Sequence, residues 1–160
     1  IDATFPPGSV PGAPKIAACG VIADLATEPR GVYCGAIGWV DADRRVGDLN
    51  VAPYEHDVWS HRQLLRVVSH TPVEREKFAA AQESGAWVDA MRALVPHEQK
   101  LYSWWSYRNR DWEKSDRGRR LDHIWLSPAL APQLKSGIIV REARNFESPS
   151  DHVPVMVELR

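Results

Sequence analysis

The sequence predicts an α/β fold, and three observations support this. Residues 74–94 carry apolar side chains at helical spacing and break at Ser84-Gly85, which indicates a pair of helices. Short apolar or alternating runs, typical of strands, occupy residues 46–53, 121–126, 138–142 and 153–159. The 160 residues are 44% hydrophobic and 26% charged, the composition of one globular domain that can bury a core. Helices and strands mixed along one such domain favour an α/β architecture.

The first part of the chain predicts one helix and one strand. A proline- and glycine-rich loop covers residues 5–15, and Pro14 is well placed in the first turn of a helix that runs to about Leu25. Residues 32–40 favour a strand whose glycines allow a neighbour or a ligand to approach closely. A turn over residues 41–44 would follow.

The remaining elements are predicted from local pattern. Residues 46–53 form a short apolar segment that contains Asp48 and Asn50, which is typical of a strand whose end faces a site. Residues 102–108 form an aromatic-rich loop that lies between strands, and most tryptophans of the second half are expected in the core. The apolar positions of the helix pair are Val73, Phe78, Ala81, Val88, Met91 and Leu94.

The charge balance excludes a globally basic nucleic-acid binder. With 20 basic and 21 acidic residues the formal net charge is -1, so any site for a polyanion must be local. Basic residues outnumber acidic ones between Arg108 and Arg120. This stretch is either a phosphate-facing strip or a solvated loop.

Cysteine usage and hydropathy exclude two further classes. Cys19 and Cys34 have no C-x-x-C spacing and no signal peptide precedes them, so neither a disulfide framework nor a cysteine zinc site is indicated. No apolar run reaches the roughly 20 residues that span a bilayer. We therefore expect a cytoplasmic protein without a membrane partner.

Acidic and imidazole groups recur at the ends of predicted strands, in residues 47–50, 119–123 and 149–154. Phosphodiester cleavage needs such groups, because a carboxylate orients water, an amide and an imidazole hold the phosphate, and further carboxylates bind a divalent metal ion. Each acid also has a structural alternative. Asp48 could cap a turn, Asp122 could pair with Arg120, and Asp151-His152 could be polar surface.

The order of the motifs resembles a known family. The chain contains, in sequence, Gly47-Asp48-Leu49-Asn50, Tyr102-Ser103-Trp104-Trp105-Ser106-Tyr107-Arg108, Arg117-Gly118-Arg119-Arg120-Leu121-Asp122 and Ser150-Asp151-His152-Val153-Pro154-Val155. This series resembles the C-terminal half of the exonuclease III family over about 115 residues. The resemblance implies an endonuclease/exonuclease/phosphatase-type sandwich, of which this part would supply one sheet and its helices. It also implies cleavage of DNA at abasic sites and from 3′ ends with Mg²⁺ or Mn²⁺.

The resemblance also implies roles for individual residues. Asp48 would position the attacking water, and Asn50 and His152 would contact the scissile phosphate. Asp122 would hydrogen-bond the other ring nitrogen of His152 and fix its tautomer. Asp151 would lie at the metal ion.

DNA contacts are implied by the same resemblance and by the basic stretch. Trp104 and Leu121 resemble the positions that wall the pocket for a flipped-out abasic sugar, although Trp104 could instead be an ordinary core aromatic. Arg108 and Arg119 are the candidate DNA-binding cations.

Nothing before Asp48 resembles the Asn, the metal-binding Glu or the Tyr that the family carries in its first half. Residues 4–43 instead resemble a segment of chorismate-utilising enzymes, namely aminodeoxychorismate synthase and anthranilate synthase component I, and that segment contains Gly12, Lys15, Tyr33 and Gly35. In that family the glycine-rich backbone binds substrate carboxylates and the strand with Tyr33 lines the site. The family's lysine segment, one magnesium-binding glutamate and the closing Ile-Arg-Thr are absent here, so these residues are not expected to function.

The sequence thus predicts a chorismate-enzyme-like fragment over residues 1–45 and an exonuclease III-like half over residues 46–160. The expected function is a divalent-metal-dependent DNA phosphodiesterase, weak or inactive because the first half is missing. The alternatives are a DNA-binding remnant or inactive chimera and, less favoured, a chorismate-type lyase or transferase. A natural fusion, an assembly artefact and a designed chimera all fit the junction. An uncovered apolar sheet face is expected to cause self-association.

Overall fold

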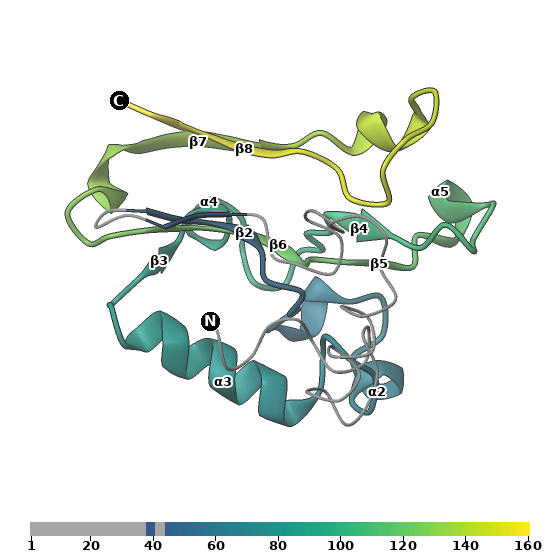
Figure 1. Ribbon diagram of the computed structural model, residues 1–160, viewed down its shortest axis with the longest axis horizontal. Helices are drawn as coiled ribbons and strands as arrows, with labels where there is room; N and C mark the ends of the chain where they lie inside the picture. Colours follow the sequence, from purple (N-terminus) through teal and green to yellow (C-terminus); the bar gives the residue numbers. More distant parts are fainter. Residues whose placement is uncertain (1–37, 41–43) are drawn as a thin grey trace, which may run out of the picture. The chain divides into compact units, whose positions relative to one another are not determined.

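The structure, a computed structural model, describes residues 38–40 and 44–160 (Figure 1). The chain divides into two units, residues 1–38 and 39–160, and the second is described here. The predicted helix over 14–25, most of the predicted strand over 32–40 and the chorismate-like residues Gly12, Lys15, Tyr33 and Gly35 lie outside the described residues. No helix among the described residues is long and apolar enough to cross a membrane.

The largest sheet is built on a central antiparallel pair. Strand β2 (Arg44–Asp48) pairs with β6 (Asp122–Leu126), with β1 (Gly38–Val40) outside β2 and β3 (Val88–Asp89) on the far edge of β6. The register places Asp48 opposite Asp122. Because both residues lie at the ends of adjacent strands, their side chains are brought to one edge of the sheet.

A second layer packs on this sheet. Strands β7 (Leu134–Ile139) and β8 (Val155–Leu159) form an antiparallel pair that Figure 1 shows as a separate layer above β2 and β6. The inward side chains of this pair, among them Val155 and Val157, pack on a core of Ala90, Ile124 and Leu126. The described residues therefore supply strands to both sheets of a sandwich, and the expectation that they supply only one sheet is wrong. The reason is that β7 and β8 form a sheet of their own that packs on the first.

The outer face of β7 and β8 is partly apolar. Ile138 and Met156 are opposite one another across the pair and are 55% and 51% exposed. Lys135 and Ser136 on β7 contact Glu158 on the neighbouring strand. The face is a candidate for self-association, which remains a prediction.

The helices are short except for α3. The elements are η1 (Glu55–Asp57), α2 (His61–Leu64), α3 (Pro72–Glu83), α4 (Ala90–Leu94), α5 (Trp112–Ser115), η2 (Ala131–Gln133) and η3 (Arg141–Asn145). Helix α3 begins with a capping box in which Thr71 and Glu74 bond each other's backbone N–H groups, with Pro72 as the first helical residue. It ends at Ser84, so the predicted break between two helices is confirmed. Strand β3, which the pattern did not indicate, lies between them.

The apolar positions of the helix pair are only partly buried. Phe78 is the one buried residue of α3 and packs against His123 and Trp125 on β6. Val73 and Leu94 are exposed although the helical spacing predicted burial. Ala81 is exposed as well, so Phe78 supplies the buried apolar contact of α3, and polar contacts such as that of Arg75 with Pro53 O add to it.

Two strand predictions are confirmed and two are corrected. Strands β6 and β8 lie within the predicted 121–126 and 153–159. The predicted strand over 46–53 ends at Asp48, because Asn50 adopts a left-handed φ of 52° that extended chain cannot continue through. The strand predicted over 138–142 starts at Leu134 instead, and residues 141–145 form η3, since β7 follows the length of its partner β8.

A third sheet is small and pairs β4 (Trp104–Trp105) with β5 (Gly118–Arg119). Aromatic residues, among them Trp105, form a core cluster at this sheet. Trp105 and Trp112 pack edge to face at a centroid distance of 5.2 Å. The expectation that most tryptophans are core holds for these two and for Trp125, whereas Trp104 is only partly buried.

Candidate active site

Two carboxylates and one imidazole meet at the end of the central strand pair. One ligand atom from each of Asp48, Asp122 and His152 lies within 4.8 Å of the others. Asp122 Oδ2 is 2.9 Å from Nδ1 of His152, and Asp48 Oδ2 is 3.8 Å from its Nε2. The imidazole thus lies between two acids that the sequence separates by 74 residues, as the register of β2 on β6 dictates.

Asn50 belongs to the same edge. Its backbone N–H donates to Asp48 Oδ1 at 2.9 Å and its side-chain amide donates to Asp48 Oδ2 at 2.8 Å. The left-handed backbone of Asn50 makes both contacts possible, and asparagine tolerates that conformation better than most residues. Asp48 therefore both caps the turn at Asn50 and belongs to the cluster.

The cluster perturbs the acid–base properties of its members. Burial raises the pKa of Asp48, and the charge of Asp122 adds to this, while His152 and Asn50 act in the opposite direction without cancelling it. Burial lowers the pKa of His152, but the hydrogen bond and charge of Asp122, followed by the charges of Asp48 and Asp151, outweigh it and raise the pKa. The imidazole is therefore held protonated to higher pH than in solution.

Ser103 holds Asp122 in place, and the sequence did not single it out. Its fully buried hydroxyl donates to Asp122 Oδ2 at 2.6 Å. Oγ of Ser103 also accepts from the backbone N–H groups of Leu121 and Asp122, each at 3.1 Å. One hydroxyl thus joins β6 to the segment before β4. Its place within the Tyr102 to Arg108 motif was the signal that could have found it.

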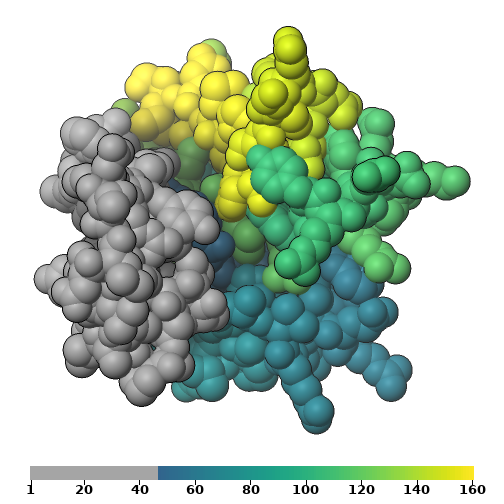
Figure 2. Space-filling model, turned by 45° about the vertical axis from the view of Figure 1, so that its right-hand side comes forward, coloured from purple at the N-terminus to yellow at the C-terminus, as the bar shows by residue number. Residues whose placement is uncertain are grey.

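Asp151 stands beside the cluster and outside it. Its Oδ2 accepts from the indole Nε1 of Trp104 at 2.9 Å, and its backbone carbonyl accepts from Trp105 N–H at 2.9 Å. Trp104 also pairs with His152 through an isolated backbone bridge. In Figure 2, yellow residues near the C-terminus lie against green residues from the segment after position 100.

The loop after Asn50 is fixed through three consecutive carbonyl oxygens. His123 donates to Val51 O at 2.8 Å, His70 donates to Ala52 O at 2.6 Å, and Arg75 donates to Pro53 O at 2.6 Å; these three side chains come from different elements. Carbonyl oxygens only accept, which assigns the ring proton of each histidine to the bonded nitrogen. The clamp restricts the segment that carries Asp48 and Asn50, and no local pattern predicted it.

The alternative pairing of Asp122 with Arg120 is wrong. Arg120 is buried and its guanidinium contacts Asp57, at 3.0 Å, and Asp89, at 2.6 Å. Burial raises the pKa of Asp89, but the neighbouring His123 and the charge and hydrogen bond of Arg120 outweigh it and hold the pKa well below its usual range. Arg120 is instead satisfied by the buried acids Asp57 and Asp89, while Asp122 bonds Ser103 and His152.

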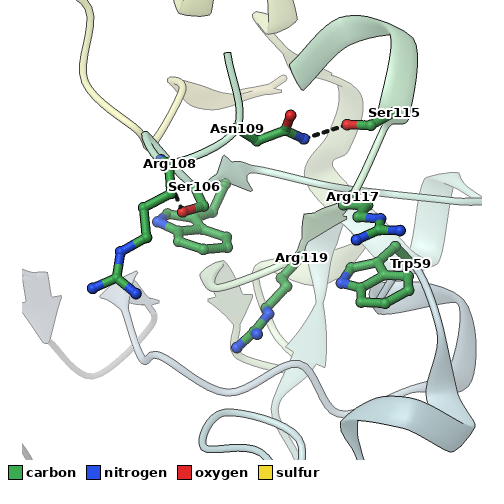
Figure 3. Close-up of a pocket in the computed structure, with 8 residues that line it drawn as sticks. Trp59, Ser106, Arg108, Asn109, Ser115, Arg117 and Arg119 are labelled. Carbon is green, nitrogen blue, oxygen red and sulfur yellow. Dashed lines mark hydrogen bonds between the residues drawn. The ribbon is translucent and has the colours of Figure 1, made fainter. Parts of the chain in front are cut away.

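The candidate DNA-binding residues divide into two groups. Trp104, Arg108 and Arg119 line one pocket of about 400 Å³ (Figure 3). Leu121 does not line it: the side chain is 4% exposed and packs with Val58 in the core. Burial leaves little of Leu121 to reach a ligand. Trp104 is partly exposed in the pocket and also packs against the core, so both readings of it stay open.

The donor set fits a loosely held divalent ion. Mg²⁺ keeps several waters and takes one or two carboxylates together with substrate phosphate oxygens, and Mn²⁺ accepts similar ligands. Asp48 and Asp122 offer carboxylate oxygens within 4.8 Å of each other. Asp151 directly precedes His152 in the sequence. The described residues do not form a closed six-oxygen cage.

Comparison with known proteins shows what the C-terminal part resembles. Exodeoxyribonuclease III of Haemophilus influenzae is 31% identical over 121 residues, covering 72% of this chain and 45% of that protein. A DNA repair nuclease of Danio rerio is 36% identical over 113 residues, covering 71% of this chain and 34% of that protein. The C-terminal part of this chain resembles the exonuclease III family. The chain spans less than half the length of these exonuclease III-type relatives.

Solved structures agree on the fold. A 3′ phosphatase from Neisseria, bound to a product DNA hairpin, matches with a TM-score of 0.68 and 32% identity, covering 74% of this chain and 46% of that chain. An AP endonuclease from Archaeoglobus fulgidus matches with a TM-score of 0.70 and 29% identity, covering 75% and 47%. The expected α/β sandwich of exonuclease III type is thereby confirmed.

The N-terminal resemblance has a match as well. A family model described as chorismate binding enzyme matches residues 1–52. The match overlaps the first residues of the exonuclease III-like part, and the exact domain boundary stays a prediction.

Proposed function

We propose that residues 46–160 carry the phosphate-cleaving half of a DNA phosphodiesterase of the abasic endonuclease and 3′ exonuclease type. The observation that supports this most is the imidazole of His152 between Asp48 and Asp122, at 3.8 and 2.9 Å. Such a cluster combines a carboxylate for water with a protonated imidazole for phosphate.

Each residue has a step that its contacts allow. Asp122, fixed by Ser103, bonds Nδ1 of His152 and leaves Nε2–H free to donate to a phosphate oxygen. Asp48 would orient a water molecule and take a proton from it, and its raised pKa favours proton uptake. The amide of Asn50 would bind a second phosphate oxygen once it turns from Asp48. A divalent ion held by Asp151, when bound, would offset charge on the phosphoryl group.

DNA would be held by the pocket next to the cluster. Trp104 connects the two, since its indole N–H bonds Asp151 while its ring carries the guanidinium of Arg119 at 5.3 Å. Arg108 is exposed and lines the same pocket. The related Neisseria structure bound to a DNA hairpin supports DNA as the substrate class.

Residues 1–47 contain no counterpart of the family's metal-binding Glu or its Asn and Tyr, so we propose that residues 1–160 alone cleave DNA weakly. A DNA-binding remnant without turnover is the alternative, and residues 1–45 would then be a fragment of different ancestry. A chorismate-type activity is least supported.

Incision of duplex DNA that contains one abasic analogue distinguishes these functions. With Mg²⁺ or Mn²⁺ the phosphodiesterase should produce a nick that EDTA abolishes, and His152→Ala should remove it. A binding remnant should retain DNA in EDTA and give no nick under any metal. Equal incision by wild type and His152→Ala would contradict the proposal, because the nick would then come from a contaminant.

A further inference from the structure

The pocket that Trp104 lines lies outside the catalytic cluster. It has a volume of about 400 Å³, and no member of the cluster Asp48, Asp122 and His152 lines it. Figure 3 shows Arg117 and Trp59 on one side, Arg119 between, and Arg108 on the other. The complete lining is Trp59, Trp104, Ser106, Arg108, Asn109, Ser115, Arg117 and Arg119. Only Trp104, Arg108 and Arg119 among them have been given a role so far, and Trp59 and Arg117 are the large side chains that remain.

The lining is cationic and contains no acid. Three guanidinium groups, those of Arg108, Arg117 and Arg119, face a pocket with no carboxylate in its wall. Within residues 44–160 no ion pair joins any of the three to an Asp or Glu. Glu74 is not part of the wall, but its charge acts on Arg119. Three guanidinium groups still converge where the wall itself has no acid, and an anion between them would relieve their repulsion. The pocket therefore favours an anionic ligand.

The guanidinium groups are also held in place. Nη1 of Arg119 donates to Val68 O at 3.0 Å and to Ser69 Oγ at 2.8 Å, while its buried Nε has no partner among the described residues. Arg117 lies over the ring of Trp59 at 4.7 Å, and the backbone N–H of Trp59 bonds Gly118 O at 3.2 Å. Planar donors stacked on indole rings lose little freedom when they bind a phosphate in a fork.

We propose that this pocket is a second phosphate subsite, in which Arg117 and Arg119 bind the phosphodiester of a nucleotide that neighbours the one at the cluster. This rests on the proposed function, because Trp104 joins the pocket to the cluster through Asp151. The indole of Trp59 and the edge of Trp104 give the sugar and base apolar surface. A nucleotide strand fits this combination better than a free phosphate ion, which needs no aromatic wall.

Binding of short single strands to the full chain in EDTA tests the subsite. A labelled trinucleotide should bind several-fold more tightly than a dinucleotide, and Arg117→Gln should weaken the trinucleotide about fivefold and remove this difference. The slope of log K against log salt should fall by about 0.7 for the lost phosphate contact. Lys114→Gln is the matched control, since this cation is exposed in α5 and does not line the pocket. It should change the affinity less than twofold.

The outcomes separate the subsite from the catalytic proposal. Loss of the length-dependent gain in Arg117→Gln supports the subsite even if no DNA is cleaved. Unchanged affinity and salt slope in Arg117→Gln, with cleavage that still depends on His152, would overturn the subsite and leave the catalytic proposal standing. Inorganic phosphate should compete only weakly. If it displaced the trinucleotide fully at low millimolar concentration, the pocket would be a free-anion site and the nucleotide assignment would fall.

Discussion

Replacing Ser103 with alanine should destabilise the protein strongly for so small a change. The hydroxyl is 0% exposed, donates to Asp122 Oδ2 at 2.6 Å and accepts two backbone N–H groups at 3.1 Å. Its removal leaves one carboxylate oxygen and two amide donors without that partner. An unmade buried hydrogen bond costs about 1–3 kcal/mol, and partial entry of water reduces the sum, so we expect a loss of about 2–4 kcal/mol.

Urea unfolding followed by circular dichroism and tryptophan fluorescence measures this loss. Ser136→Ala is the matched control, because the hydroxyl of Ser136 bonds Glu158 on an exposed strand pair and should change the free energy of unfolding by less than about 0.5 kcal/mol. If Ser103→Ala stayed within 0.5 kcal/mol of wild type at an unchanged m-value, the three contacts would carry little stability. Ser103 could then not be what fixes Asp122.

Three further predictions concern charge and surface. Arg108→Ala combined with Arg119→Ala should reduce the salt slope of duplex DNA binding by about 1.8, and an equal slope would place the contact elsewhere. The pKa of Asp89 in the folded state lies below its unfolded value of about 3.9, so its stabilisation is present above that pH and is lost as the pH falls below it. Asp89→Asn should therefore flatten the dependence of the free energy of unfolding on pH between about pH 5 and 2. The urea midpoint measured across this pH range tests it. Wild type should self-associate in sedimentation velocity, and Ile138→Ser with Met156→Ser should reverse this; a wild-type monomer at high concentration would exclude that interface.

Much of the fold could be predicted because the relevant signals are local. The apolar run of β6 and the alternation of β8 lie within a few residues, as does the Thr71 to Glu74 capping box that starts α3. Strand β7 was misplaced because its length follows from its partner β8 and not from its own residues. The packing of β7 and β8 on β6 likewise depends on residues far apart in sequence.

The candidate site shows the same division. Asp48, Asp122 and His152 lie in short motifs whose order resembles a family, so the sequence identified them before their distances were known. Ser103 and His70 act through hydrogen bonds to partners 19 and 18 residues away, and such pairs leave no periodic trace in the sequence. Leu121 was assigned to a ligand pocket from its motif, yet its burial depends on how β6 packs in three dimensions.

The central claim is that Asp48 and its neighbours perform phosphodiester cleavage, and a single-turnover rate tests it most directly. Incision of an abasic-analogue duplex in Mg²⁺ should slow on the order of a hundredfold or more in Asp48→Asn, because the amide cannot take a proton from water. Asp111→Asn, which changes an exposed carboxylate outside the cluster, should cleave at the wild-type rate. Cleavage by Asp48→Asn at the same rate as Asp111→Asn would contradict the account.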